Sequence, residues 1–168
     1  MNIVLIGYRG TGKSTVARLL GKRLGRRVVS TDAEVIARAN LPIPKIVEQF
    51  GWDHFRDLES TVCQSLVDKD KLVIDTGGGV ILRDENVAAL KAHGVAVWLT
   101  AEVSTIASRI GRDTQRPSLS GTKTFVEEIE EILNIREPKY QTAADYVIPT
   151  DQSSPKQITD LILKQISL

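Results

Sequence analysis

Eight residues near the N-terminus have the types and spacing needed to bind phosphate. They read GYRGTGKS from Gly7 to Ser14 and match the Walker A pattern, G-x-x-x-x-G-K-[ST], at every fixed position. Glycines let successive backbone N–H groups turn inward around phosphate oxygens, because no Cβ atoms obstruct the turn. Lys13 is expected to reach the β- and γ-phosphates, and the Ser14 hydroxyl is the expected Mg²⁺ ligand.

The remaining loop positions carry separate predictions. Gly10, Thr11 and Gly12 are expected to contact ATP, and Thr15 is expected to border the same site while supporting the helix start. Arg9 stands at a variable position of the pattern, so it is interpreted as a surface residue. An accidental glycine-rich turn is the alternative, with a chance of about one in a hundred or less at ordinary residue frequencies. Such a turn need not follow a strand or open a helix.

The loop lies between a predicted strand and a predicted helix. Ile3 to Ile6 form a short apolar run that is mostly β-branched, which is typical of a strand buried on both faces. After Lys13, apolar residues recur with a helical period until Gly25. Further strands are predicted at Arg27–Ser30, Leu72–Thr76, Val95–Thr100 and Tyr146–Pro149. Five short strands separated by helices predict an α/β fold with a parallel sheet.

Two insertions are predicted in this core. The long stretch between the second and third strands exceeds one crossover, and it is predicted to form helices at Asp32–Ala39, Ile43–Phe50 and Asp53–Val67. Gly111 to Lys123 show no apolar periodicity and are predicted to form a mobile lid. The 168 residues therefore predict one domain, with a core at 1–31, 61–110 and 125–168, a substrate-binding lobe at about 32–60 and a lid at about 111–124.

The overall composition argues against several classes of protein. Lys and Arg number 22 and Asp and Glu number 21, so the net charge near +1 indicates neither a nucleic-acid nor a membrane partner. The single cysteine, Cys63, excludes an internal disulfide framework and fits a reducing compartment. The apolar run near the N-terminus ends at Gly7, before it reaches the length of a signal peptide or membrane span. A cytoplasmic protein, monomeric by default, is expected.

A phosphate-binding loop alone does not distinguish a kinase from a GTPase, a motor or a passive nucleotide-binding module. No N-K-x-D run indicates guanine recognition. Phosphoryl transfer to a metabolite needs a carboxylate that orients the attacking hydroxyl, cations that neutralise the transferred group, and a lid that excludes water. The sequence offers candidates for all three, so a small-molecule kinase is favoured.

A series of short motifs extends along nearly the whole chain: Gly7–Thr15, Asp32, Phe55-Arg56, the Gly77–Gly79 triplet, Arg116-Pro117, and Arg136 with Pro138 and Tyr140. In this order and spacing they resemble the shikimate kinase family, which uses ATP to phosphorylate the 3-hydroxyl of shikimate in aromatic amino-acid biosynthesis. The resemblance implies a three-layer P-loop kinase fold, in which helices flank a five-stranded parallel sheet with substrate-binding and lid insertions. ATP and shikimate are the implied partners.

The resemblance also assigns roles to charged residues. Asp32 is implied to hold the substrate hydroxyls and to act as base or orienter, whereas capping of the next helix is the alternative. Arg56 and Arg136 are implied to bind the shikimate carboxylate, for which a guanidinium fork is well suited. Their alternatives are a solvated ion pair on a helix for Arg56 and a helix-end charge for Arg136.

Further assignments concern the strand end and the nucleotide. Gly77, Gly78 and Gly79 are interpreted as a close approach to substrate, since a simple turn rarely needs three consecutive glycines. By resemblance, Arg116 closes with the lid over the transferring phosphoryl group, in the manner of an arginine finger supplied in cis. Arg109 and Pro155 match positions that flank adenine in the family.

One position departs from the family pattern and affects the metal site. Many members carry an acidic residue two positions before the one matched by Asp32, where it helps to hold Mg²⁺ through water, but this chain has Ser30. Asp75, at the end of the third predicted strand, is a position from which a Walker B-like carboxylate reaches Mg²⁺. The hypothesis is that Asp75 replaces the missing acidic partner beside Ser14.

Two rival functions stay open on the sequence alone. The first is another P-loop metabolite kinase, such as a gluconate or nucleoside monophosphate kinase, against which Arg56, Arg136 and the glycine triplet argue. The second is a nucleotide-binding regulatory module without catalysis, which Ser30 alone suggests and against which Lys13, Asp32 and Arg116 argue. His54, His93, Cys63, Trp52 and Trp98 receive no catalytic role.

Overall fold

The computed structural model of the chain describes residues 1–111 and 125–167. Within these residues it contains five strands, β1 (Asn2–Ile6), β2 (Val28–Ser30), β3 (Val73–Asp75), β4 (Gly94–Thr100) and β5 (Tyr146–Pro149). The helices are α1 (Lys13–Leu24), α2 (Thr31–Ala39), α3 (Ile43–Gln64), α4 (Asp84–Lys91), α5 (Val103–Ile110), α6 (Phe125–Ala143) and α7 (Pro155–Gln165). A short 3₁₀ helix, η1, covers Val80–Leu82.

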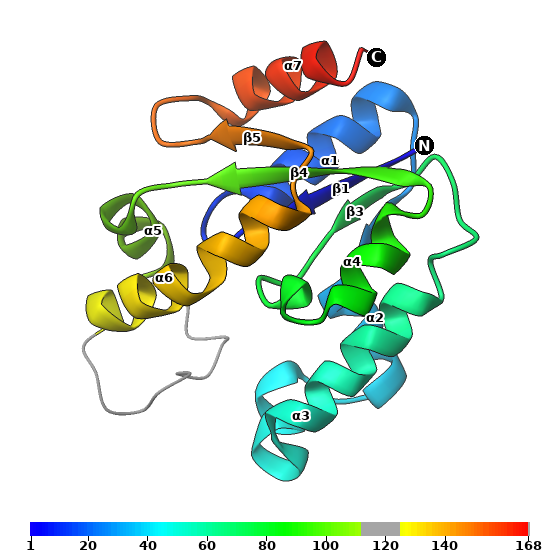
Figure 1. The fold of residues 1–168 in the computed structure, drawn as a ribbon, viewed down its shortest axis with the longest axis vertical. Coiled ribbons are helices and arrows are strands. Elements are labelled where there is room, and N and C mark those ends of the chain that lie inside the picture. The colour runs from blue at the N-terminus through cyan, green and yellow to red at the C-terminus, as the bar shows by residue number, and fades with distance from the viewer. Residues whose placement is uncertain (112–124, 168) are drawn as a thin grey trace.

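The strands form one parallel sheet in the order β2-β3-β1-β4-β5 (Figure 1). The predicted α/β fold and its five parallel strands are therefore confirmed. Because β1 is central, its pairing with β3 and β4 buries it on every side, and Ile3 and Leu5 have no exposed surface. A continuous apolar run is the pattern that such a doubly covered parallel strand requires.

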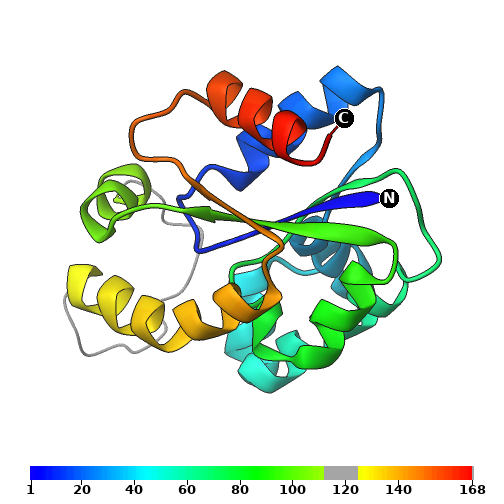
Figure 2. The same cartoon turned by 45° about the horizontal axis from the view of Figure 1, so that its top comes forward.

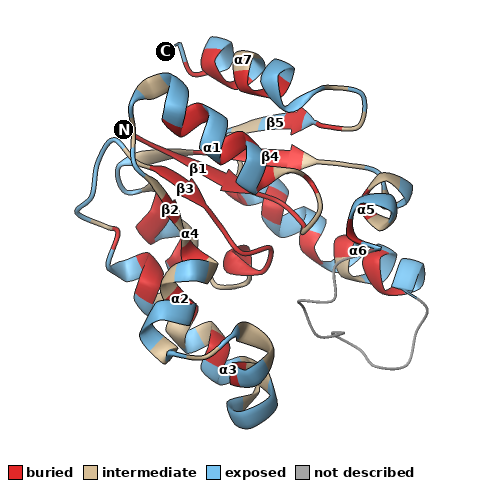
Figure 3. Ribbon diagram, turned by 180° about the vertical axis from the view of Figure 1, so that it is seen from behind, coloured by how far each residue is buried: buried red, intermediate tan, exposed pale blue. Residues whose placement is uncertain are grey.

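Helices cover both faces of the sheet, so the protein has three layers (Figure 2). On one face, α1 and α7 pack over an apolar cluster that includes Leu5, Leu20 and Ile162. On the other face, α2, α3, α4 and α6 contribute to a second cluster that includes Ile74 and Tyr140. In Figure 3 the residues of the central strands are coloured as buried, and they lie between these two helical layers.

Two glycines interrupt helical structure, one at the end of α1 and one inside α3. Gly25 stops α1 with a left-handed φ of 62°, a conformation that costs glycine little. Gly51 lies inside α3 with φ 84° and ψ 170°, which kinks the helix between its two arms. The separate helices predicted at 43–50 and 53–67 are thus the two arms of α3, which ends at Gln64.

All parallel strands point their carboxyl ends to the same edge of the sheet, where open α/β sheets bind their ligands. The residues that follow β1, β2 and β3 are the phosphate-binding loop, the start of α2 and the glycine triplet, respectively. The fold therefore brings three sequence-distant segments to one edge.

Candidate active site

The Walker A residues form a loop that joins β1 to α1. Gly12 precedes the helix with φ 94°, in the left-handed region that L side chains rarely adopt. Gly7 has φ 141°, and a Cβ on it would lie 2.4 Å from the Leu99 carbonyl oxygen. These two positions need glycine for the loop to take this shape and to turn its backbone N–H groups toward the helix N-terminus.

Lys13 lies inside the loop and is 7% exposed. Its Nζ donates hydrogen bonds to the carbonyl oxygens of Gly7 at 2.8 Å and Tyr8 at 2.9 Å. The Thr11 hydroxyl donates to the same Tyr8 carbonyl at 2.8 Å. The side chains of the loop therefore hold its backbone in place, which preorganises a site for phosphate.

Two cavities adjoin this loop. The phosphate-side cavity is open to solvent and is lined by Arg9, Gly10, Gly12, Lys13, Ser14, Thr15, Ser30, Asp32, Asp75, Thr76 and Ile110. The acceptor-side cavity is lined by Tyr8, Arg9, Asp32, Ile43, Trp52, Phe55, Arg56, Glu59, Gly77, Gly78, Gly79 and Arg136. Arg9 and Asp32 are the described residues that line both.

Asp32 lies in the first turn of α2, at the junction of these cavities. The cap of α2 is Ser30, whose hydroxyl oxygen accepts a hydrogen bond from the Ala33 N–H at 3.3 Å. Capping, the alternative considered for Asp32, is therefore performed by Ser30. Asp32 also lies close to Gly77, where an added Cβ would meet its Oδ1 at 2.6 Å.

Arg56 reaches the acceptor-side cavity from α3, together with a buried partner. Its Nη1 donates to Glu59 Oε2 at 2.7 Å, and the Glu59 side chain is fully buried. Burial raises the pKa of Glu59, while the adjacent Arg56 guanidinium opposes that shift. The guanidinium lies over the Phe55 ring, with Cζ 5.0 Å from the ring centroid. The expected alternative, a solvated ion pair, does not describe this buried arrangement.

Arg136 projects from the interior of α6 and is 8% exposed. A Cβ added to Gly78 would lie 3.6 Å from its Nη1, so the guanidinium lies beside the glycine triplet. The Tyr140 hydroxyl, one turn further along α6, donates a hydrogen bond to the Gly78 carbonyl oxygen. Burial raises the pKa of Tyr140 to about 12, so it remains a neutral donor. The triplet is thus fixed against α6.

The charges that line the acceptor-side cavity suit an anionic ligand. Its described lining includes three guanidinium groups, from Arg9, Arg56 and Arg136, and two carboxylates, from Asp32 and Glu59. Three cations against two anions leave an excess of positive charge in a partly buried site, where charge pairs interact strongly. Bidentate guanidinium groups are well matched to a carboxylate.

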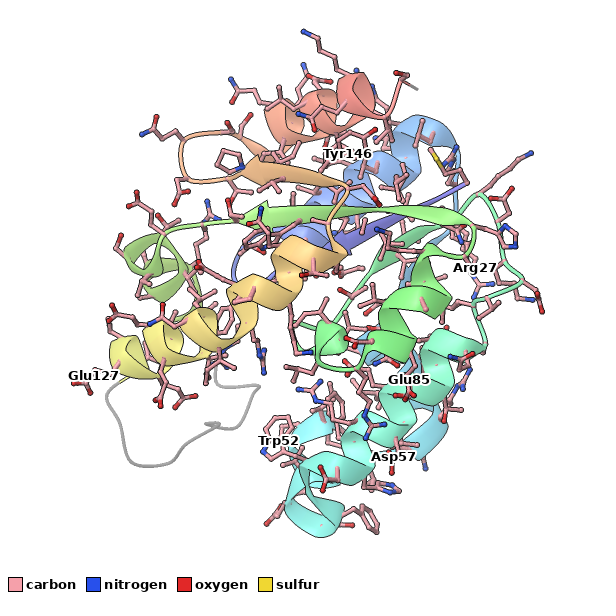
Figure 4. The ribbon with its side chains drawn as sticks, in the orientation of Figure 1. Arg27, Trp52, Asp57, Glu85, Glu127 and Tyr146 are labelled. Carbon is pink, nitrogen blue, oxygen red and sulfur yellow. The ribbon has the colours of Figure 1, made fainter. Side chains whose placement is uncertain are left out.

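Three features of this cavity were missed or misassigned from sequence. Arg9 is not a surface residue, because it is half-buried and lines both cavities. Glu59 forms an ion pair with Arg56. The two residues are three positions apart on one helix, and this spacing was the signal that could have identified the pair. Trp52 lines the cavity from α3, and Figure 4 labels it beside that helix.

The predicted nucleotide residues outside the loop have different surroundings. Arg109 Nη1 donates to the Gly10 carbonyl oxygen at 3.2 Å and to Thr150 Oγ1 at 3.0 Å, so it joins the loop to the end of β5. Pro155 is exposed in the first turn of α7. Arg116 and the predicted lid, apart from Gly111, lie outside the described residues.

Three residues surround the expected cation position. Ser14 Oγ donates to Asp75 Oδ2 at 2.6 Å, and Ser30 and Asp75 are register partners on the neighbouring strands β2 and β3. All three line the phosphate-side cavity. The described residues hold no cluster of three or more His, Cys, Asp or Glu side chains that could bind a metal by themselves. A Ser-Asp pair fits Mg²⁺, which is commonly bound by one or two protein ligands together with substrate phosphates.

Other residues set aside at the sequence level are accounted for by packing. Cys63 is fully buried and free, and burial raises the pKa of its thiol to about 12, which makes it unreactive. Trp98 is buried and stacks on Tyr140, with ring centroids 5.5 Å apart. None of the helices in the described ranges has the length and apolar character needed to cross a membrane.

Comparisons with known proteins agree on one family. A sequence model of the shikimate kinase family matches residues 9–167. The shikimate kinase of Nitratidesulfovibrio vulgaris is 42% identical over 152 residues, covering 89% of this chain and 86% of that protein. The shikimate kinase of Thermodesulfovibrio yellowstonii is 39% identical over 164 residues, covering 98% and 94%.

A solved structure extends this agreement to three dimensions. The shikimate kinase of Acinetobacter baumannii, determined in complex with shikimate, superimposes with a TM-score of 0.93 at 36% identity, covering 99% of this chain and 92% of that one. The motifs, the fold and the sequence similarity all extend over nearly the full length. This chain belongs to the shikimate kinase family.

Proposed function

We propose that this protein transfers the γ-phosphoryl group of ATP to the 3-hydroxyl of shikimate, giving shikimate 3-phosphate and ADP. The observation that carries the proposal is the pair of adjoining cavities that meet at Asp32. One is bordered by the phosphate-binding loop, and the other contains Arg56 and Arg136. An acceptor with a hydroxyl at one end and a carboxylate at the other fits this arrangement.

In the proposed reaction, Asp32 orients the acceptor hydroxyl and takes its proton as the oxygen attacks. A bond forms between this oxygen and the γ-phosphorus, while the bond from that phosphorus to the β,γ-bridging oxygen breaks and ADP leaves. Because the transition state involves little covalent work by the protein, positioning and charge neutralisation provide most of the catalysis. Lys13 supplies one cation at the phosphates, and Arg116 is the proposed second.

Arg56 and Arg136 bind the acceptor carboxylate in this proposal and so fix which hydroxyl faces the loop. The Glu59 carboxylate is close enough to Arg56 to hold its guanidinium in one orientation. A guanidinium that is already ordered loses less side-chain entropy when the ligand binds. The Gly78 and Gly79 backbone is proposed to contact the same substrate.

The wider organisation is also a proposal. Helix α3 supplies several lining residues of the acceptor-side cavity, which supports a substrate-binding lobe at about 32–60. We retain residues 111–124 as the lid, Arg109 and Pro155 as neighbours of adenine, and a cytoplasmic monomer as the working state. A net charge near +1 supports the absence of a nucleic-acid partner.

Ser14 and Asp75 are the residues proposed to hold Mg²⁺. The ion held there would supply positive charge that neutralises the phosphates of ATP. Asp75 ends a strand next to β1, which is the position of a Walker B carboxylate. Asp75 also lies directly across from Ser30 on the paired strand β2. A carboxylate at either of these two positions would bind a cation at the same place.

Asp75→Asn is expected to weaken binding of Mn²⁺, used as a paramagnetic substitute for Mg²⁺, to the protein–ATP complex about tenfold, because one carboxylate contact is lost. Affinity for metal-free ATP is expected to stay within twofold. Electron paramagnetic resonance of free Mn²⁺ measures the first quantity, and calorimetry in the presence of a chelator measures the second.

A carboxylate moved to the neighbouring strand is the matched control for this prediction. Ser30→Asp in the Asp75→Asn background should recover most of the lost Mn²⁺ affinity, since Asp caps a helix as well as Ser does. The proposal for Asp75 is wrong if Asp75→Asn leaves Mn²⁺ affinity unchanged while Ser14→Ala reduces it.

Gly79→Ala is expected to raise the KM for shikimate about 10- to 100-fold, because the new methyl group must displace the Arg56 guanidinium from its site. A Cβ at this position would lie 2.2 Å from Arg56 Nη2. The KM for ATP is expected to change less than twofold. Steady-state kinetics with each substrate varied separately measure both effects.

Gly25→Ala provides a control glycine outside the site. An added Cβ there meets no atom within 4 Å, and the strain at its φ of 62° affects only the end of α1. This variant should lower the melting temperature without changing the KM for shikimate. An unchanged shikimate KM in Gly79→Ala would contradict the contact between Arg56 and the substrate.

The product identifies the reaction directly. The protein is incubated with MgATP and shikimate, and phosphorus–proton correlation spectra are recorded together with the amount of ADP. One phosphate ester, coupled to the proton at carbon 3, should form for each ADP released. Release of ADP without an ester would indicate ATP hydrolysis, and an ester at another carbon would show that the acceptor is bound differently.

A further inference from the structure

The variable position of the phosphate-binding loop that carries Arg9 lies where the two cavities meet. Arg9 and Asp32 border both cavities, and the other described lining residues border one or the other. Asp32 comes from the start of α2, whereas Arg9 comes from the loop that surrounds the phosphates. The junction therefore has a carboxylate from one element and a guanidinium from another.

The Arg9 side chain is partly buried without a full set of partners. Its Nε is buried and has no hydrogen-bond partner among the described residues. Its Cζ lies 6.0 Å from the centroid of the Tyr8 ring, and Tyr8 is itself fixed in an apolar cluster with Ile106 and Ile129. A buried N–H donor without an acceptor is unfavourable, so this guanidinium is suited to an acceptor that a ligand supplies.

The position of Arg9 restricts which part of a ligand it can meet. Arg56 and Arg136 lie beside Gly79 and Gly78, at the glycine-triplet side of the acceptor cavity. Lys13 and Ser14 lie in the phosphate-side cavity, which Arg9 also borders. The group expected at the junction is the phosphoryl group that passes from ATP to the acceptor. It carries negative charge throughout the transfer.

We propose that the Arg9 guanidinium binds the phosphoryl group at the junction, first during transfer and then as the 3-phosphate of the product. This inference rests on the proposed function. Arg9 neither gains nor loses a proton in the step, and it acts by neutralising charge on the phosphoryl oxygens. Because shikimate lacks this phosphate, Arg9 favours the phosphorylated acceptor over the unphosphorylated one.

Arg9→Met is the test, since methionine keeps much of the contact with the Tyr8 ring and removes the charge. Binding of shikimate 3-phosphate is expected to weaken about 10- to 100-fold, which corresponds to the loss of a charged hydrogen bond. Binding of shikimate is expected to change less than twofold. Calorimetry measures both affinities, and the ratio of the two is the quantity that a purely structural role would not change.

The rate of the first turnover gives a second measurement. With enzyme in excess over ATP, phosphoryl transfer in Arg9→Met is expected to be about 10- to 100-fold slower than in the wild type. Arg9→Lys retains charge without the guanidinium fork, so it should lie between the two. Arg27→Met is the control, because the Arg27 side chain is exposed and lies far from Trp52 in Figure 4. This variant should match the wild type in both measurements.

The possible outcomes separate this inference from the proposed function. A wild type that forms no shikimate 3-phosphate overturns the proposed function. The role of Arg9 is overturned if the wild type forms shikimate 3-phosphate but Arg9→Met changes neither the ratio of product to substrate affinity nor the first-turnover rate. Equal loss of both affinities, together with a lower melting temperature, would also overturn it, because it would show that Arg9 only supports the loop.

Discussion

Asp32→Asn is expected to lower kcat about 100- to 10,000-fold, the range over which a positioned general base contributes to catalysis. Asparagine keeps the size of the side chain and one acceptor oxygen, but it cannot take the hydroxyl proton. Ser30 caps α2, so the substitution leaves the helix cap intact. Steady-state and first-turnover kinetics measure the rates, and calorimetry should find shikimate bound within about tenfold of the wild-type affinity.

Asp68→Asn is a suitable comparison, because Asp68 is exposed between α3 and β3 and borders neither cavity. It should retain the wild-type kcat. A kcat for Asp32→Asn within threefold of the wild type would show that this carboxylate neither accepts the proton nor orients the hydroxyl. The acid-base part of the mechanism would then require another residue.

Arg136→Met is expected to weaken shikimate binding about 30- to 5,000-fold, as for the loss of one partner from a buried charge pair. The guanidinium is 8% exposed and lies against the glycine triplet, so water cannot readily replace it. ATP affinity should change little, because Arg136 borders the acceptor-side cavity and not the phosphate-side cavity. Calorimetry with each ligand separately measures this difference.

Arg136→Lys distinguishes charge from geometry. Lysine keeps the charge but offers a single ammonium in place of a planar fork, so about tenfold of the affinity should still be lost. Shikimate affinity in Arg136→Met within threefold of the wild type would contradict the proposed carboxylate site. Melting temperatures of both variants show whether a change reflects the site or the packing of α6.

Much of the fold could be predicted because its signals are local. Ile3 to Ile6 are apolar without interruption because β1 is covered on both faces, and Gly25 ends α1 because it takes a left-handed conformation. The strand ends were less predictable. The third strand was expected at Leu72–Thr76, yet β3 begins one residue later and ends one residue earlier, since strand limits depend on tertiary pairing.

The parts of the site that sequence reasoning missed depend on how the tertiary fold buries residues. Glu59 resembles a solvated helix residue in sequence, but in the structure it is fully buried beside Arg56 on α3. Arg9 occupies a position that the loop pattern leaves variable, and its orientation depends on Tyr8 packing against α5 and α6. The spacing of Arg56 and Glu59 indicates their pairing but not its burial, and no spacing rule specifies the orientation of Arg9.

The metal site illustrates what pairing of strands adds to a motif. From sequence, Ser30 and Asp75 are separate residues, and their relation rests on a hypothesis about a displaced carboxylate. The register places them opposite one another on β2 and β3, and Ser14 donates to Asp75 from the loop. This register supports the proposal that Asp75 takes the place of an acidic residue at position 30.

The most direct test of the central claim measures kcat/KM for MgATP with a panel of acceptors: shikimate, gluconate and nucleoside monophosphates. ADP release is followed by a coupled assay. If Arg56 and Arg136 bind the acceptor carboxylate while Asp32 orients its hydroxyl, kcat/KM for shikimate should exceed that for every other acceptor at least about 1,000-fold, because mismatched acceptors leave buried polar groups unpaired. A nucleoside monophosphate or gluconate that exceeds shikimate would contradict the account.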